Sequence, residues 1–252
     1  MNELDDPNPV PPPRDGESAA QPSKDEIPEL PLNPTWGELV ESLLKSPAEV
    51  FERLLTERPR IVGLLVAISF VGHTAYGLIL GAFSGYEQLW AAPIKFTFGS
   101  FAAAALCLPS LYVLTCMSGI GLRVNQVVSI LAGIYAMTSL LLLAFAPVAF
   151  VFTYSVNAVG WMGFFHLGIW GISIGIGLNF LFAGMLRTRS LRSNLLHAWA
   201  VILIVTLLQM SATLRPLIGR ADTYFAPERR FFVEHWWQTS LGKIGEELRE
   251  DD

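Results

Sequence analysis

The sequence predicts an all-α polytopic membrane protein: a bundle of five transmembrane helices, with short cytoplasmic amphipathic helices before it and an aromatic-rich C-terminal helix after it. Of the 252 residues, 52% are hydrophobic and only 15% are charged, whereas soluble domains carry about 25% charged residues. The charges also lie outside five long uncharged windows. Since about 20 apolar residues cross a bilayer as a helix, each window is long enough to span it.

The five windows contain no Asp, Glu, Lys or Arg and define a predicted transmembrane domain over residues 61–217. Every backbone polar group inside lipid must be bonded within its own segment, so each window is predicted to be a helix. The uncharged run from 124 to 186 is too long for one span, and Tyr154, Ser155, Asn157 and Gly160 form a turn signal inside it. The predicted spans are 61–83, 96–120, 127–152, 161–186 and 195–214.

Basic residues beside the spans predict how the chain is oriented. Eight of them lie on the side of the N-terminus and three lie close to the membrane on the other side. Because loops rich in Lys and Arg stay in the cytoplasm, we expect a bacterial inner-membrane protein with its N-terminus in the cytoplasm and its C-terminus outside. The first group is Lys45, Arg53, Arg58, Arg60, Arg123, Arg187, Arg189 and Arg192, and the second is Lys95, Arg215 and Arg220.

Two different segments precede the first span. Residues 1–34 contain nine prolines, eight acidic residues and two basic ones, which predicts a disordered or polyproline II tail. Residues 35–60 are predicted to form short amphipathic helices, because Thr35 with Glu38 makes a capping box and Pro47 suits a helix start. Their apolar faces and the bases beside them predict that they lie on the anionic inner leaflet.

Residues 218–252 are predicted to form an extracytoplasmic amphipathic tail. Six aromatic residues fall within fourteen positions of it. Such rings either lie at the headgroup level of a membrane or fill the core of a protein interface, and the sequence leaves both interpretations open. The candidates for partner binding are Tyr224, Phe225, Phe231, Phe232, Trp236 and Trp237.

Small residues spaced four apart predict where helices approach one another closely. They occur in the first, second and fourth spans, so we expect these three spans to form the tight centre of the bundle. Pro109 and Pro147 lie inside the second and third spans and are expected to kink them. The pairs of small residues four apart are Gly77 with Gly81, Gly99 with Ala103, Gly171 with Gly175, and Ser173 with Gly177.

Residues that could carry chemistry are sparse. The spans contain no Asp or Glu, which argues against a proton pump or antiporter. Gly171, Ser173 and Gly175 match the G-x-S-x-G pattern of hydrolases, but they lie inside a predicted helix and not at the strand-to-helix turn that this motif needs. His73 and His166 are the candidates for holding a haem between two spans. We expect no enzyme activity, no cofactor, no metal site and no nucleic-acid partner.

One stretch before the first span resembles a known family. The phrase Ser46-Pro47-Ala48-Glu49-Val50-Phe51-Glu52-Arg53, together with five spans and a proline-containing tail, is similar to Yip1-type membrane proteins, particularly bacterial Yip1-domain-like proteins. The resemblance covers roughly residues 46–217. The D-L-Y-G-P and G-Y-x-x-x-P signatures of the eukaryotic members are missing. The resemblance implies a non-enzymatic membrane organiser or adaptor and transfers no functional residue.

These observations predict a non-catalytic membrane accessory or scaffold protein that binds the bilayer and a partner, either another protein or a second copy. The first alternative is a channel or facilitator for a small solute, in which the kinked second and third spans line a path and Asn179 or Gln209 contacts the solute. The second alternative is a haem- or redox-binding subunit, which depends on His73 and His166.

Overall fold

The computed structural model describes residues 31, 33–56, 59–84, 88–119, 121–155, 159–187 and 193–213. Within these ranges the regular structure consists of seven helices without any strand, which confirms the predicted all-α class. The predicted aromatic C-terminal helix and nearly all of the predicted acidic tail lie outside the described residues. The helices are α1 (Trp36–Lys45), α2 (Pro47–Leu54), α3 (Pro59–Ser84), α4 (Gln88–Met117), α5 (Val124–Ser155), α6 (Val159–Arg187) and α7 (Ser193–Thr213).

The start of α1 is fixed by the predicted capping box. The Thr35 hydroxyl accepts a hydrogen bond from the Glu38 N–H at 3.4 Å, and the Thr35 N–H donates to the Glu38 carboxylate at 2.7 Å. These two bonds give acceptors to the backbone N–H groups of Thr35 and Glu38, which have no acceptor within the helix because they lie at its start. The bond from the Thr35 N–H also lowers the pKa of Glu38 below its usual 4.5.

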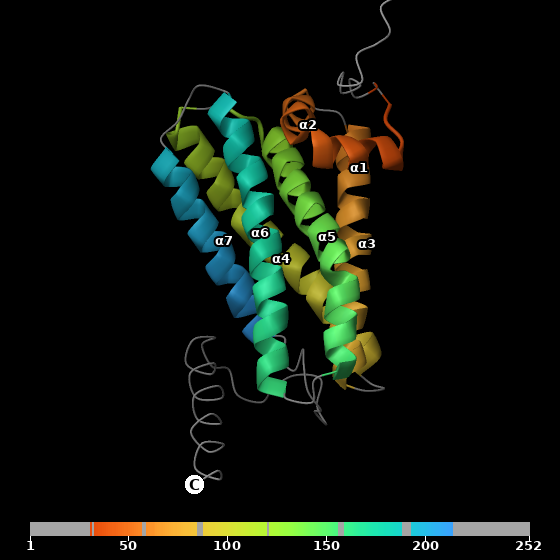
Figure 1. Cartoon of the computed structure of the whole chain (residues 1–252). Coiled ribbons are helices and arrows are strands. Elements are labelled where there is room, and N and C mark those ends of the chain that lie inside the picture. The colour runs from red at the N-terminus through yellow and green to blue at the C-terminus, as the bar shows by residue number, and fades with distance from the viewer. Residues whose placement is uncertain are drawn as a thin grey trace, which may run out of the picture.

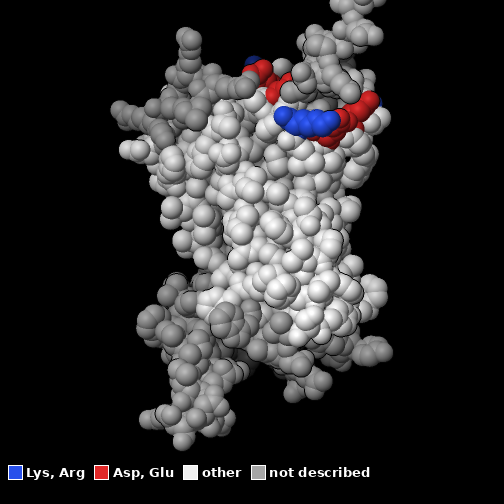
Figure 2. All heavy atoms as spheres, viewed as in Figure 1, with Lys and Arg blue, Asp and Glu red and all other residues white. Residues whose placement is uncertain are grey.

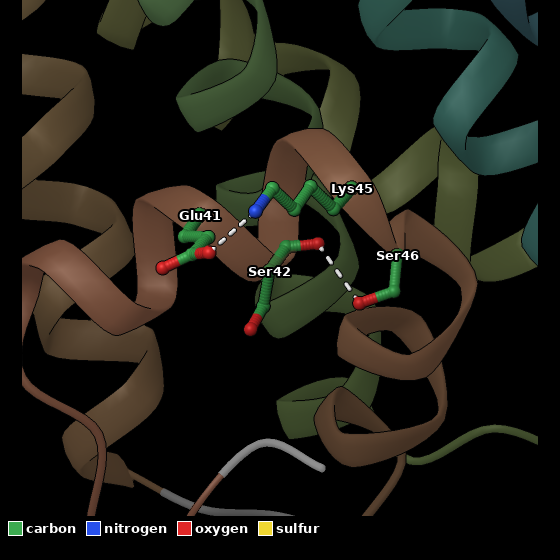
Figure 3. Close-up of polar contacts among 4 residues, drawn as sticks. All are labelled: Glu41, Ser42, Lys45 and Ser46. Carbon is green, nitrogen blue, oxygen red and sulfur yellow. Dashed lines mark hydrogen bonds and ion pairs between the residues drawn. The ribbon is translucent and has the colours of Figure 1, made fainter. Parts of the chain in front are cut away.

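The junction between α1 and α2 is a sharp turn of one residue, Ser46. The Ser46 hydroxyl donates to the Ser42 carbonyl at 3.3 Å, while Lys45 Nζ lies 2.6 Å from Glu41 Oε1 on the preceding turn (Figure 3). The ion pair is exposed and therefore contributes little stability. The hydroxyl bond instead closes the last turn of α1, and Pro47 starts α2 at a position where its missing N–H costs nothing.

The five remaining helices, α3 to α7, are each long and apolar enough to cross a membrane. They alternate in direction, and α1 and α2 lie across one end of the bundle (Figure 1). Four of the spans begin and end within about three residues of the predicted limits, but α4 begins at Gln88, eight residues before the predicted start at 96. The uncharged window stopped at Lys95, yet a single Lys near a helix end does not break a membrane helix. Lys95 is 8% exposed within α4.

The centre of the bundle is α5, which contacts α3 along one side and α6 along another. Most of its apolar stretch is buried, whereas most of the stretch in α7 is exposed. The remaining close pairs are α3 with α4 and α4 with α7, so the helices follow the order α6, α5, α3, α4 and α7 around the bundle. The expectation that the first, second and fourth spans form the centre is therefore wrong, because the third span takes that place.

Several glycines do allow close approach between helices. A Cβ atom at Gly77 would lie 2.5 Å from Pro93 Cα, and one at Gly72 would lie 2.6 Å from Ser139 Cβ. Gly177 faces Thr138 so closely that no side chain fits between them. Gly81, Gly99 and Ala103 are also buried.

Gly171 and Gly175 behave differently. Both are exposed on α6, and a Cβ atom at either would meet nothing within 4 Å. The prediction that Gly171 and Gly175 bring α6 against another helix does not hold within this chain, because the face of α6 that enters the bundle carries the other predicted small pair, Ser173 and Gly177. A helix turns 100° per residue, so a register shift of two residues is enough to move a small-residue stripe from the inside to the outside.

The surface of the bundle matches a membrane-embedded protein. Figure 2 shows a broad middle band without Lys, Arg, Asp or Glu, and coloured charges at the end where α1 and α2 lie. Large apolar side chains of α4, α5 and α7, such as Phe98, Leu106, Val151 and Val205, are more than half exposed. A soluble monomer rarely exposes so much contiguous apolar surface. The five helices and this band indicate a membrane protein.

Candidate functional site

The first candidate site is the cap, which we define as α1 and α2, residues 36–54. The helix α2 packs on α5 and α6, and α1 packs on α2. The apolar faces of these helices turn largely toward protein, and their predicted place on the inner leaflet stays a prediction. Trp36 and Leu44 remain about half exposed, at 47% and 56%. The buried side chains of the cap are Leu39, Leu43, Val50, Phe51 and Leu54.

Phe51 is the anchor of the cap. Its side chain is 1% exposed, and its ring lies directly against the backbone of Gly184 in α6, where any Cβ atom would overlap it. The Phe180 ring meets it edge-on with centroids 5.6 Å apart, and Gly133 of α5 makes room for both Phe180 and Leu54. Gly184 and the Phe180 ring thus form a socket for the Phe51 ring, with Gly133 behind Phe180, and the spacing of small residues did not predict this feature.

Hydrogen bonds of the Gln126 side chain, here called the amide clasp, hold the C-terminal end of the cap to α5. The side-chain N–H of Gln126, in the first turn of α5, donates to the Leu55 carbonyl at 2.7 Å. The carbonyl of the same side chain accepts from the Arg123 N–H at 2.8 Å. One amide therefore bonds the carbonyl of Leu55, the residue after α2, and the N–H of Arg123, the residue before α5. The cap is fixed by apolar packing at one point and by hydrogen bonds at another.

The second candidate site is a group of polar and aromatic side chains at mid-bundle. His73 Nδ1 donates to the Ser69 carbonyl at 2.8 Å, and its ring stacks on Tyr135 with centroids 5.7 Å apart. The Tyr135 hydroxyl donates to the Ser100 carbonyl of α4 at 2.9 Å. Hydroxyl and imidazole groups in apolar surroundings need such partners, since an unbonded group costs several kcal/mol.

A second hydrogen bond, between Tyr76 and His166, joins α3 to α6. The Tyr76 hydroxyl lies 2.9 Å from His166 Nδ1, and both side chains are at least 96% buried. His166 Nε2 has no hydrogen-bond partner within the described part of the chain. His73 and His166 were predicted as candidate site residues and Tyr76 was not, although Tyr76 lies about one helical turn after His73 and faces His166.

A small cavity lies between all five long helices. Its volume of about 10 Å³ is enough for roughly one water molecule. Bound organic groups usually occupy cavities of about 300 Å³ or more. The polar residues of its lining are His73, Ser100, Tyr135 and Thr138, and the other lining residues are Ile134, Trp170, Ile174, Leu203 and Leu207.

His73 and His166 do not fit a haem held between them. The Phe96 ring lies 5.6 Å from His73 and 5.9 Å from Tyr76, and Tyr76 contacts His166 with centroids 5.7 Å apart. The space that a porphyrin would need between the two histidines is therefore filled by aromatic side chains. The predicted haem pair is not supported by this arrangement.

Ser173 has a structural role in α6. Its hydroxyl is buried and donates to the Ile169 carbonyl one turn earlier, at 2.8 Å. This places it in the common arrangement of serine in membrane helices. The aromatic partner-binding candidates Tyr224, Phe225, Phe231, Phe232, Trp236 and Trp237 lie outside the described residues.

Comparison of the chain with protein-family models, with curated proteins and with solved structures finds no match. The similarity to Yip1-type proteins therefore stays a prediction from the sequence.

Proposed function

We propose that this protein is a non-catalytic integral membrane scaffold that binds a partner in or at the bilayer. The observation that carries the proposal is how the described part of the bundle interior is filled. Most of its buried polar side chains bond to other helices or to carbonyls of their own helix, and the cavity lined by His73 and Tyr135 has room for roughly one water molecule. A protein whose interior is occupied in this way offers its surface, and not its centre, for function.

The same geometry argues against the channel alternative. Asn179, which was expected to contact a solute on a path through the bundle, is exposed on the outer side of α6. Pro109 and Pro147 lie inside continuous helices and not at a break that would line a path. A facilitator would need an opening between α4 and α5 that admits more than a single water molecule.

The cap gives the proposed scaffold a rigid end. Phe51 in its glycine socket and the Gln126 amide clasp hold α1 and α2 in one position, with Trp36 and Leu44 facing outward. We place this end on the cytoplasmic side of a bacterial inner membrane, since Lys45, Arg53 and Arg123 lie at it and basic loops stay inside. The proposed partner is either another protein or a second copy of this chain.

Two measurements on the full chain test the proposal. After mild detergent extraction, the scaffold function predicts a stoichiometric partner that stays bound during purification. The chain reconstituted alone in proteoliposomes is expected to conduct no solute above the leak of empty vesicles. Saturable solute flux by the purified chain would refute the proposal, and so would a purely monomeric state with no partner in native membranes.

A further inference from the structure

The small cavity at the centre of the bundle is lined by a particular set of polar groups. Its volume of about 10 Å³ is the room of roughly one water molecule. Four lining side chains are polar: His73 from α3, Ser100 from α4, and Tyr135 and Thr138 from α5. All four are buried, with between 1% and 6% of their surface exposed. The hydrogen bonds that they already make determine which groups are left for a molecule in the cavity.

Three of these side chains can only accept a further hydrogen bond. His73 Nδ1 lies 2.8 Å from the Ser69 carbonyl, which cannot donate, so Nδ1 carries the proton. The ring is neutral, because α3 to α7 contain no carboxylate that could pair a buried charge, and Nε2 is therefore an acceptor. The Tyr135 hydroxyl gives its hydrogen to the Ser100 carbonyl, and the Thr138 hydroxyl gives its own to a carbonyl of α5. Both oxygens keep lone pairs that can accept.

The Ser100 hydroxyl is an exception among the buried hydroxyl groups of the five long helices. Every other buried Ser or Thr described in these helices has a hydrogen bond, and most donate to a carbonyl about one turn earlier, as Ser69, Ser129 and Ser173 do. The described residues give the Ser100 hydroxyl no such bond. Since an unbonded buried hydroxyl is costly, a molecule in the cavity is the acceptor that Ser100 lacks.

We infer that this cavity binds a single water molecule that joins α3, α4 and α5. The water gives one hydrogen to His73 Nε2 and the other to the Tyr135 or the Thr138 oxygen, and it accepts the hydrogen of the Ser100 hydroxyl. Buried waters make about three hydrogen bonds to groups that otherwise have none, and this site offers that number. An organic ligand needs a cavity many times larger. The inference goes beyond the proposed scaffold function and does not depend on it, because it concerns only the interior of the bundle.

Crystals of the full chain grown from lipid test the site directly. At a resolution that shows ordered water, we expect a density peak within about 3 Å of both His73 Nε2 and Ser100 Oγ. A cavity without such a peak would overturn the inference. A direct hydrogen bond from the Ser100 hydroxyl to His73 Nε2 would overturn it as well, because it would leave no donor for the water.

The stability of a serine variant gives a second test, in which a wet and a dry cavity predict different results. With the water bound, Ser100→Ala removes one of its hydrogen bonds and should lower the equilibrium constant for folding roughly 5-fold, which corresponds to about 1 kcal/mol. In a dry cavity the hydroxyl has no partner, so its removal should leave the constant unchanged or raise it. A denaturant titration in micelles measures the constant, and an unchanged or higher value would contradict the bound water.

Ser173→Ala is the matched control. Ser173 is also buried, but its hydroxyl donates within α6 and it does not line the cavity. In crystals of Ser173→Ala the density peak should stay, whereas in Ser100→Ala it should weaken or disappear. A peak that keeps its full height in Ser100→Ala would refute the bond that joins the water to α4.

Discussion

Replacing Phe51 by Ala should release the cap from the bundle. The Phe51 ring is 1% exposed, lies against Gly184 and meets Phe180 edge-on at 5.6 Å. It is the side chain of α2 that enters the glycine socket, so its removal leaves an empty space that Ala cannot fill. The five long helices should stay folded, because their contacts with one another do not involve this ring.

The expected size of the effect follows from burial. Truncating a buried Phe to Ala costs about 3–5 kcal/mol in well-packed sites, including the edge-to-face contact. Each 1.4 kcal/mol changes an equilibrium tenfold, so the population of the undocked cap should rise by at least about 100-fold. Phe51→Leu fills most of the socket and should cost less than about 1.5 kcal/mol.

Amide hydrogen exchange of the protein in lipid nanodiscs measures this opening, since local unfolding exposes the N–H groups of one segment at a time. Peptides covering residues 36–54 should exchange at least about 100-fold faster in Phe51→Ala, and peptides from α5 should not change. Leu44→Ala is the matched control, because Leu44 belongs to the same cap but is 56% exposed. Equal protection of the cap in the wild type and in Phe51→Ala would refute the socket as its anchor.

Three further predictions follow from other contacts. Gly177→Leu should destabilise the bundle by several kcal/mol, because Thr138 occupies the space for the new side chain. Gly171→Leu should leave the thermal transition of the monomer unchanged. Similar melting temperatures of the two variants would contradict the assigned faces of α6. Tyr76→Phe removes a buried hydrogen bond to a histidine that has no other described partner and should lower the free energy of unfolding by about 1–3 kcal/mol in a denaturant titration in micelles. The pKa of Glu38 is lowered in the folded chain, so its carboxylate stabilises the start of α1 above pH 4.5, and this contribution is lost as the pH falls through the folded pKa. NMR chemical shifts of the first turn of α1 should report that titration, and Glu38→Gln should abolish it.

The local features of the fold could be predicted because each depends on a few adjacent residues. The capping box at Thr35 and Glu38 was predicted correctly, since it is set by bonds within one helical turn. Pro47 starts α2 as predicted, although the Ser46 side chain makes no capping hydrogen bond there. The spans were predicted because transfer of an uncharged segment into lipid depends on composition alone. The start of α4 was missed because one charge, Lys95, ended the uncharged window although the helix continues through it.

The candidate sites could be predicted only in part. His73 and His166 were selected as unusual residues in apolar spans, but the tyrosines that bind or stack on them come from other turns and other helices. The socket of Phe51 joins α2 to Gly184 and Phe180 of α6, with Gly133 of α5 behind Phe180, and no spacing within one segment indicates that combination. Composition reveals which residues are exceptional, whereas their partners depend on how the helices are rotated.

The sequence by itself determined that this chain forms apolar helices long enough to cross a membrane and where the short helices before them begin. Those properties come from the free energy of placing single segments in water or lipid, and neighbours hardly alter it. The tertiary structure decided that the third span lies at the centre, that the cap packs on protein, and that Gly171 and Gly175 face outward with Asn179. The physical reason is that side-chain packing fixes the rotation of each helix about its axis, and a hydrophobic helix has no strong preference for one face until its neighbours are in place.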